Sequence, residues 1–292
     1  AVALASHMAA LGLCAAIIAA LWLIARVPSF MLPKPRLAIA AGALAAGIAL
    51  CPLSNLAITG NFAFTPGGSS FLFGRLIEDG IVARHLDDRC PDASLRICAY
   101  RNELPQEADD WLWANDTPFY KLGGWQDFGT EESEIIWATL ARYPLMHAET
   151  AVADSVRQLF TLKTEVSTRD NAPTVETIAD RLPQLLSPLL AGRQQTDAID
   201  PDVLNLVHVP FAVFSIAALA GALFFRQRIE MTPQQAALCV CVLIALAANA
   251  AICSVFSHPV DRYQSRLVPL VPFAIALLLI GRDRLGRPYD LT

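Results

Sequence analysis

The chain of 292 residues is 54% hydrophobic and 17% charged, whereas ordinary soluble domains are about 45 to 50% apolar and about 25% charged. This composition predicts a membrane protein. The net charge of -5 is small and the basic residues form short clusters, which argues against a broad basic surface for nucleic acid.

Five apolar stretches approach the roughly 20 residues that a membrane-spanning helix needs. They cover residues 2–24, 37–58, 203–225, 235–256 and 267–281. The polar segment 59–202 lies between the second and third stretches and holds nearly all the acidic residues. We therefore expect an all-α integral membrane protein with two transmembrane helices in residues 1–58, a water-exposed and mostly helical domain in 59–202, and three transmembrane helices with a short tail in 203–292.

The chain begins within an apolar stretch, without an initiator Met, a basic leader or a small-residue cleavage site before it. This start favours the hypothesis that the chain is the C-terminal portion of a longer polytopic protein. Earlier transmembrane segments, or partner membrane subunits, would then complete the bundle.

Lysine and arginine in the short connections indicate the orientation, because translocated short loops are depleted of them. The basic residues of these connections are Arg26, Lys34, Arg36, Arg226, Arg228, Arg282, Arg284 and Arg287. All of them fall on one side of the five expected helices. Taking that side as the cytoplasm places the 59–202 domain and the loop at 257–266 in the periplasm of a bacterium, so the predicted location is the inner membrane.

The stretch TPGGSSFLFGR, residues 65–75, is a Gly-rich turn that leads into a helix just outside the second apolar stretch. Free N–H groups and the positive end of the helix dipole suit such a helix start to a phosphate. The candidate phosphate-binding residues of this stretch are Gly67, Gly68, Ser69 and Arg75. The alternative is that the two glycines only turn the chain.

Three helical stretches are expected in the polar segment, because its apolar residues recur at spacings of three and four. They cover residues 71–86, 131–164 and 174–190. Ser69 or Ser70 is the expected N-cap of the first helix. Pro144 should break or kink the second, and Pro183 and Pro188 should interrupt the third.

Of the seven cysteines, only Cys90 and Cys98 lie outside the apolar stretches, in RCPDASLRIC. Exported thiols are normally oxidised, and a bond across so short a loop would fix the end of the preceding helix. We therefore expect a disulfide in preference to two free thiols. No zinc site is expected, because no second cysteine pair or nearby histidine pair completes four ligands.

The stretch WLWANDTPFYKLGGW, residues 111–125, is rich in aromatic side chains that combine a flat apolar face with a polar tip. Such side chains can stack on a sugar or anchor a protein at the membrane interface. Core packing or interfacial anchoring is favoured over sugar binding here. Asp109, Asp110 and Asp116 lie nearby and could act as bases, although acidic surface residues are usually only solvated.

The stretch SHPVDRYQSRLVPLVPF, residues 257–273, places charged residues against the last apolar stretch. The fifteen residues 267–281 make only about 22 Å of helix, against a hydrocarbon layer of about 30 Å. Arg262, Tyr263 and Arg266 are therefore expected at or slightly below the depth of the lipid headgroups.

Two further features of this stretch bear on its role. Pro269 and Pro272 lack N–H donors, which frees carbonyl groups one turn earlier and favours a polar pocket over lipid-exposed backbone. An arginine held at this depth is a candidate ligand for a phosphate, with which it forms a bidentate pair. The alternative is that Arg262 pairs with Asp261 and that both arginines reach ordinary lipid headgroups.

The stretch DRYQSRLVPLVPF, an Arg-Tyr pair before a proline-punctuated last helix, resembles the final helix of C-type (GT-C) membrane glycosyltransferases. Donors of that family are lipid-phosphate-linked sugars, so the resemblance implies a lipid-phosphate role for Arg262, Tyr263 and Arg266. The segments PGGSSFLFGRLIEDG, RCPDASLRIC, LPQEADDWLW and LNLVHVP also resemble a group of uncharacterised proteobacterial membrane proteins of the same plan, over nearly the whole chain.

The chain departs from the glycosyltransferase pattern at its beginning. That family carries its key acidic residue in the first external loop, and the present chain starts after that point in our interpretation, so the resemblance supplies no catalytic base. We expect a role in envelope glycan assembly by transfer from a polyprenyl-phosphate-linked sugar, with this chain as the carrier-binding half and no cofactor indicated. The alternative is a non-enzymatic membrane subunit whose periplasmic domain docks a partner protein. Membrane lipids are the partners common to both.

Overall fold

The computed structural model describes residues 8–28, 36–65, 67–114, 116–164, 172–196 and 198–285. In these ranges all regular structure is helical and no strand occurs. The prediction of an all-α protein is confirmed for this part of the chain.

Four described segments are long and apolar enough to cross a membrane. They are α3 (Leu37–Thr59), α13 (Pro201–Phe224), α14 (Pro233–Phe256) and the segment Asp261–Ile280, which contains α15 (Asp261–Ser265) and most of α16 (Leu270–Leu285). The helix α2 (Met8–Ile24) is equally apolar but has only 17 residues. The first expected span begins at residue 2, so its start lies outside the described residues.

Two of the apolar helices, α13 and α14, begin at residues whose side chains satisfy exposed N–H groups. The Asp200 carboxylate accepts the Asp202 N–H at 2.9 Å at the start of α13. Thr232 and Gln235 form a capping box at the start of α14. Each of these N-terminal caps supplies acceptors for N–H groups that have no partner within the helix.

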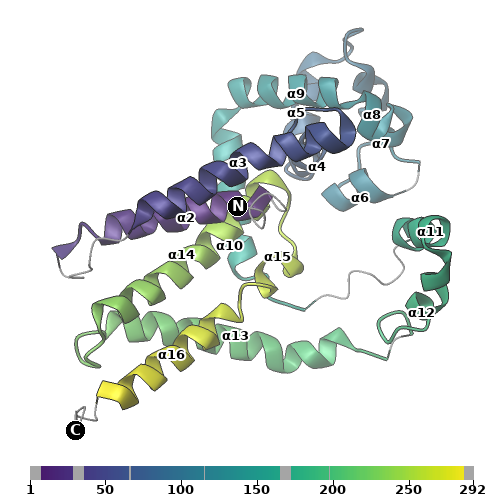
Figure 1. Cartoon of the computed structure of the whole chain (residues 1–292). Helices are drawn as coiled ribbons and strands as arrows, with labels where there is room; N and C mark the ends of the chain where they lie inside the picture. Colours follow the sequence, from purple (N-terminus) through teal and green to yellow (C-terminus); the bar gives the residue numbers. More distant parts are fainter. Residues whose placement is uncertain are drawn as a thin grey trace.

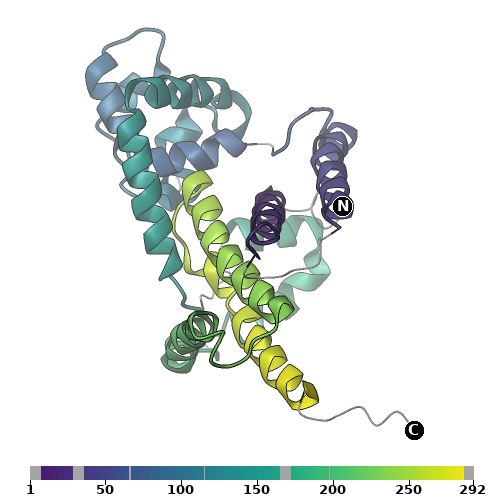
Figure 2. The same ribbon diagram turned by 90° about the vertical axis from the view of Figure 1, so that its left-hand side faces the viewer.

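The helix α14 lies at the centre of the apolar bundle and is the most buried of the candidate spans. It packs against α2, α13 and α16, and α3 packs on the other side of α2 (Figures 1 and 2). The approach of α2 to α14 is close, since a Cβ atom at Gly12 would lie 2.8 Å from Cδ1 of Ile252. A larger residue at this position would push the two helices apart.

The ends of the apolar helices sort into two groups. The C-terminal ends of α2, α13 and α16 lie at one end of the bundle, and those of α3 and α14 lie at the other, beside the polar helices (Figure 1). The described residues that directly follow α2 and α13 therefore lie at the same end of the structure.

The polar segment folds into a series of short helices. They are α4 (Gly68–Glu78), α5 (Ile81–Arg89), η2 (Arg96–Tyr100), α6 (Ala108–Trp113), α7 (Pro118–Lys121), α8 (Gly124–Asp127), α9 (Gly129–Arg142), α10 (Pro144–Leu159), α11 (Ala172–Arg181), η3 (Pro183–Leu185) and α12 (Leu186–Leu190). The core of α4 to α9 is aromatic: Trp111 contacts the rings of Phe73, Phe119 and Phe128 with centroids 5.5 to 6.0 Å apart. All four rings are fully buried.

Two expectations for the first polar helix are wrong. Residues 71–86 do not form one helix, because the chain turns at Gly80, which has a φ of 73°, and α5 starts anew. This left-handed conformation suits glycine, which has no Cβ atom to clash. The residue before α4 is Gly67 (φ 71°), so Ser69 and Ser70 lie within the first turn rather than at the N-cap.

The breaks expected at prolines are confirmed in two of three places. Pro144 is the first residue of α10, directly after α9. Pro183 ends α11 and opens η3, whereas Pro188 lies inside α12. A proline without an N–H group is tolerated in the first turn of a helix, which accounts for Pro144 and Pro183.

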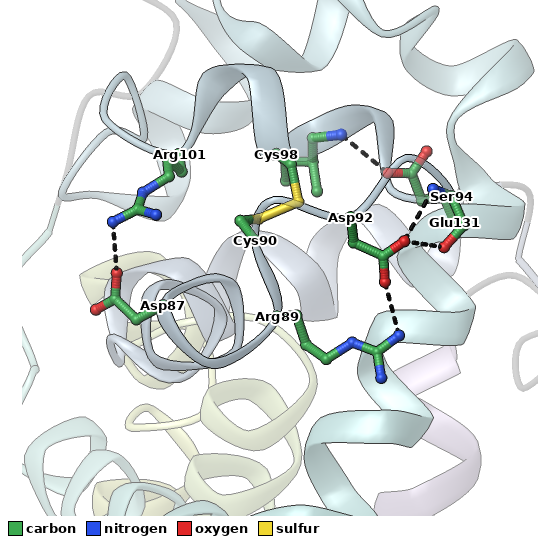
Figure 3. The surroundings of a disulfide bond; sticks show 9 residues. Asp87, Arg89, Cys90, Asp92, Ser94, Cys98, Arg101 and Glu131 are labelled. Atoms are coloured by element: carbon green, nitrogen blue, oxygen red, sulfur yellow. Dashed lines mark hydrogen bonds and ion pairs between the residues drawn. A yellow bond between two sulfur atoms is a disulfide. The ribbon is translucent and has the colours of Figure 1, made fainter.

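Cys90 and Cys98 form the expected disulfide, which ties the end of α5 to η2 (Figure 3). Next to it, the Ile97 N–H donates to the buried Glu131 carboxylate at 3.0 Å. The disulfide and this hydrogen bond together fix η2 against α5 and α9.

Candidate functional site

The three residues predicted at the membrane boundary come together around one ring. Arg262 and Arg266 are one helical turn apart, both are exposed, and their guanidinium carbons lie 5.4 and 5.6 Å from the centre of the Tyr263 ring. The Arg266 guanidinium also lies 3.6 Å from the Cys253 sulfur. Two cations beside one aromatic ring form a site suited to an anion.

Buried amide side chains hold this segment on α14. Asn249 donates to the Tyr263 carbonyl at 2.8 Å and to the Gln264 side-chain oxygen at 2.9 Å. The Gln264 amide in turn donates to the Leu246 carbonyl at 3.2 Å. The Leu267 N–H donates to Gln264 rather than to Tyr263, so Asn249 satisfies a carbonyl that the helix leaves open.

The polar helices hold the same segment from the other side. Gln158 of α10 pairs with the Val260 backbone, and Asp261 accepts the Lys163 N–H at 2.7 Å. The Asp261 carboxylate therefore has another partner, and no ion pair joins it to Arg262 in the described residues. The alternative in which Asp261 neutralises Arg262 receives no support from this geometry.

A histidine next to the arginine pair lies between two carboxylates. The Nε2 atom of His258 is 3.1 Å from Asp109, and its Nδ1 atom is 3.7 Å from Glu78. Asp109 lies in the first turn of α6 and Glu78 ends α4, whereas His258 lies between α14 and α15. Glu78 is oriented by the Ala108 N–H, which donates to it at 3.2 Å.

The environment of Asp109 keeps it ionised. Its pKa is lowered, first by the hydrogen bond from His258 and further by the charge of Arg262 and by Trp113. The side chain of Asp109 is 48% exposed and that of His258 is 13% exposed. An accessible carboxylate fixed by a histidine can accept a proton from a bound hydroxyl group.

Sequence reasoning named Asp109 as a possible base but missed His258. The two residues are 149 positions apart, so no local spacing could bring them together. The available signal was that His258 belongs to the same polar stretch, residues 257–266, as the two arginines.

The Gly-rich turn predicted to bind phosphate faces a carboxylate of the chain itself. The hydroxyl groups of Ser69 and Ser70 donate to Glu132 at 3.1 and 2.7 Å. The ring of Trp125 covers Gly67, where an added Cβ atom would lie 2.5 Å from the ring. Phosphate binding by Gly67, Gly68 and Ser69 stays a prediction, one that requires Glu132 to move or to take up a proton.

Burial dominates the titration of Glu132. Its side chain is inaccessible, and desolvation raises its pKa from 4.5 to about 7 although Ser70 and Ser69 act in the opposite direction. Loss of solvent penalises the charged form, and two hydroxyl donors do not compensate for it.

Arg75, the fourth predicted phosphate ligand, is buried and bonded to protein groups. It pairs with Asp79 at 2.7 Å and with Asp154 at 3.4 Å, and it donates to Thr150 and to the Val255 carbonyl. Burial nevertheless raises the pKa of Asp79 to about 6, more than the Arg75 charge lowers it. Arg75 thus connects α4, α10 and α14 rather than facing an open site.

The aromatic stretch has a buried and an exposed part. Trp111 belongs to the core, whereas Trp113 and Trp125 are 47% and 38% exposed and stack with Phe71 at 5.5 to 6.3 Å. Trp113 also hydrogen-bonds Asp109, so the exposed rings adjoin the carboxylate next to His258. Asp110 and Asp116 are exposed, and no hydrogen bond or ion pair brings them to His258.

Comparisons of the chain with protein-family models, with curated proteins and with solved structures give no match. Within the described ranges, no three His, Cys, Asp or Glu side chains are arranged to hold a metal ion.

Proposed function

We propose that the chain acts in envelope glycan assembly at the bacterial inner membrane by transferring a glycosyl group from a polyprenyl-phosphate-linked sugar. The observation that carries the proposal is the placement of Arg262 and Arg266 beside the Tyr263 ring at the start of an apolar span. Guanidinium groups bind phosphate oxygens through two parallel hydrogen bonds. A lipid carrier would place its phosphate at the depth of these two arginines and its hydrocarbon chain along α16.

The proposed topology has five spans, with α2 as part of the first and the polar helices in the periplasm. The gathering of the C-terminal ends of α2, α13 and α16 at one end of the bundle supports it, because the basic connections follow those ends (Figure 1). Short basic connections remain on the cytoplasmic side.

In the proposed reaction, Asp109 takes the proton of the acceptor hydroxyl. The acceptor oxygen forms a bond to the anomeric carbon of the sugar, and the bond from that carbon to the phosphate oxygen breaks with its electron pair on the phosphate. Arg262 and Arg266 stabilise the charge on the departing lipid phosphate. The hydrogen bond between His258 and Asp109 supports this role, because it keeps the carboxylate ionised and oriented.

Retention of undecaprenyl phosphate tests the proposal. Native mass spectrometry would compare the wild type with Arg262→Lys and Arg266→Lys, which keep the charge but lose the planar fork. We expect about ten- to a hundredfold weaker retention, corresponding to the loss of a charge-assisted hydrogen bond.

Two controls make this comparison specific. Arg228→Lys changes an exposed arginine at the opposite end of the bundle and should retain the probe as the wild type does. Asp109→Asn removes the proposed base but no phosphate ligand, so retention should not fall. Equal retention in all variants would reject the lipid-phosphate site.

A specific observation favours docking of a partner protein as the second candidate function. Three apolar side chains of α10 and that of Phe160, directly after it, are exposed and recur at seven and four residues, which places them on one face of the helix. They are Leu145 (69% exposed), Val152 (65%), Val156 (51%) and Phe160 (76%). An adjacent face of α10 packs on α14, where Ser155 and Ser254 are 3.3 Å apart.

Photo-crosslinking separates the two functions. A photoreactive amino acid at Val152 or Val156 should give a discrete adduct with one membrane or periplasmic protein in living cells if this face docks a partner. Glu134, an exposed residue of α9, is the matched control position. Adducts with lipid alone, or no adduct, would reject the docking function and leave the glycosyl-transfer proposal in place.

A further inference from the structure

The α11–α12 hairpin, residues 172–190, packs on itself. Within the described residues α11 contacts η3 and α12, and the aromatic core of the polar segment includes none of its side chains. Ile178 of α11 and Leu186 and Leu189 of α12 are half-buried in this small unit.

The hairpin has an exposed apolar edge. Leu182, Leu185 and Leu190 are 44%, 48% and 47% exposed, and these three residues are called the leucine edge below. Glu176 and Asp180, one turn apart on α11, are exposed on a different side from Ile178 and Leu182. The hairpin is therefore amphipathic.

The hairpin is too short and too interrupted to cross a bilayer. The helix α11 has 10 residues and α12 has 5, with Pro183 between them. A spanning helix needs about 20 apolar residues. A short amphipathic segment of this kind instead suits the boundary between headgroups and acyl chains.

The position of the hairpin in the chain indicates that lipid covers its leucine edge. Ten residue steps lead from Leu190 to Asp200, the cap of the apolar helix α13, so the two ends are at most about 35 Å apart. The connection is folded rather than extended, since Gln195 and Ala198 donate to the carbonyls of Gly192 and Arg193. Figure 1 shows α12 next to the connection that enters α13.

The apolar surface of α13 starts directly after this connection. Val203, Leu206 and Val207 are 59%, 75% and 73% exposed, as expected of side chains that face lipid. The leucine edge thus lies within reach of the bilayer that receives these side chains. Arg181 and Arg193 are exposed on the same segment and can extend toward lipid phosphates.

We propose that the α11–α12 hairpin lies on the bilayer surface where α13 enters, with Leu182, Leu185 and Leu190 among the lipid chains and Glu176 and Asp180 in water. The hairpin then fixes the polar helices relative to the membrane at a second point besides α15. This interaction does not depend on the glycosyl-transfer proposal, because it involves none of the residues of that site.

An environment-sensitive label on the full chain tests the proposal. The five cysteines outside the disulfide, Cys14, Cys51, Cys239, Cys241 and Cys253, are replaced by alanine, and a single NBD label is attached at Leu185→Cys or Leu190→Cys. The protein is placed in phosphatidylcholine nanodiscs with or without bromine on the acyl chains. We expect blue-shifted emission from both positions and loss of fluorescence with the brominated lipid.

Asp180→Cys is the matched control, because it lies on the water-facing side of the same hairpin. Its label should emit as in water and should be quenched by iodide rather than by bromine. If the labels at Leu185 and Leu190 behaved as the one at Asp180, nothing would cover the leucine edge and the proposal would be rejected. Shielding from iodide without quenching by bromine would also reject it, since protein would then cover the edge.

Discussion

Gln158 forms two hydrogen bonds with the backbone of Val260, across 102 positions of the chain. Its amide nitrogen donates to the Val260 carbonyl at 2.9 Å, and its oxygen accepts the Val260 N–H at 2.8 Å. The side chain is fully buried, so it replaces water for both backbone groups. Through these two hydrogen bonds, α10 sets the position of the residues just before Arg262.

Replacing Gln158 by leucine should therefore destabilise the protein and weaken the arginine site together. The substitution keeps the volume but leaves the N–H and carbonyl groups of Val260 without partners, at a cost of about 2 to 4 kcal/mol. Denaturant unfolding in detergent measures the first effect and retention of undecaprenyl phosphate the second. Gln126→Leu, at an exposed position, is the control and should change neither.

Arg75 and Arg262, both predicted from the sequence as phosphate ligands, should respond differently to removal. Arg75→Met leaves the buried Asp79 carboxylate and the half-buried Asp154 without their cation, which costs about 3 to 5 kcal/mol. Arg262→Met removes an exposed side chain and should leave the unfolding free energy nearly unchanged while phosphate binding is lost. Equal destabilisation by both changes would contradict the assignment of Arg75 to the interior.

Part of this architecture follows from local chemistry. Pro144 has no N–H to donate, so a helix ends before it, and Cys90 and Cys98 are close enough in sequence for a disulfide to close the loop. The break at Gly80 is harder to foresee, because the apolar spacing continues through it and only the left-handed backbone of a glycine ends the helix.

The rest depends on contacts between distant segments. The pairing of Asp109 with His258 requires α6 to lie against the end of α14, and no periodicity encodes that placement. In the same way, Arg75 lies in a stretch that suits a surface phosphate site. In the structure, however, Arg75 is buried and pairs with Asp154 of α10. Sequence patterns singled out Asp109 and Arg75 but could not show which side chains each of them faces.

The contribution of Glu132 to the stability of the protein should fall as the pH rises through its titration. Its pKa is raised from 4.5 to about 7, chiefly by burial, so between these values the folded state holds a proton that the unfolded chain has released. Unfolding free energy then decreases with pH, by up to about 3 kcal/mol over the window. Unfolding measured at pH 4.5 and pH 8 checks this slope.

Glu132→Gln removes the titration and keeps an oxygen that can accept from Ser69 or Ser70. The variant should match the wild type below pH 4.5, exceed it in stability at pH 8, and show a flatter pH dependence. His85 and His147, whose pKa values are lowered by burial, add a contribution of the opposite sign in this window, so the comparison between wild type and variant is decisive. A variant whose pH dependence matched that of the wild type would contradict the raised pKa of Glu132.

The orientation of the bundle is tested by labelling single cysteines in spheroplasts. Gln126 is exposed in α8, and Gln227 is exposed in the basic connection between α13 and α14, so a maleimide can reach either side chain if it can reach that side of the membrane. With the polar helices in the periplasm, a membrane-impermeant maleimide should modify Gln126→Cys in intact spheroplasts and should modify Gln227→Cys only after permeabilisation. The native free cysteines all lie in the apolar helices and serve as the background of the assay. The opposite pattern would place the polar helices, Asp109 and the arginine pair on the cytoplasmic side, where a periplasmic acceptor could not reach them.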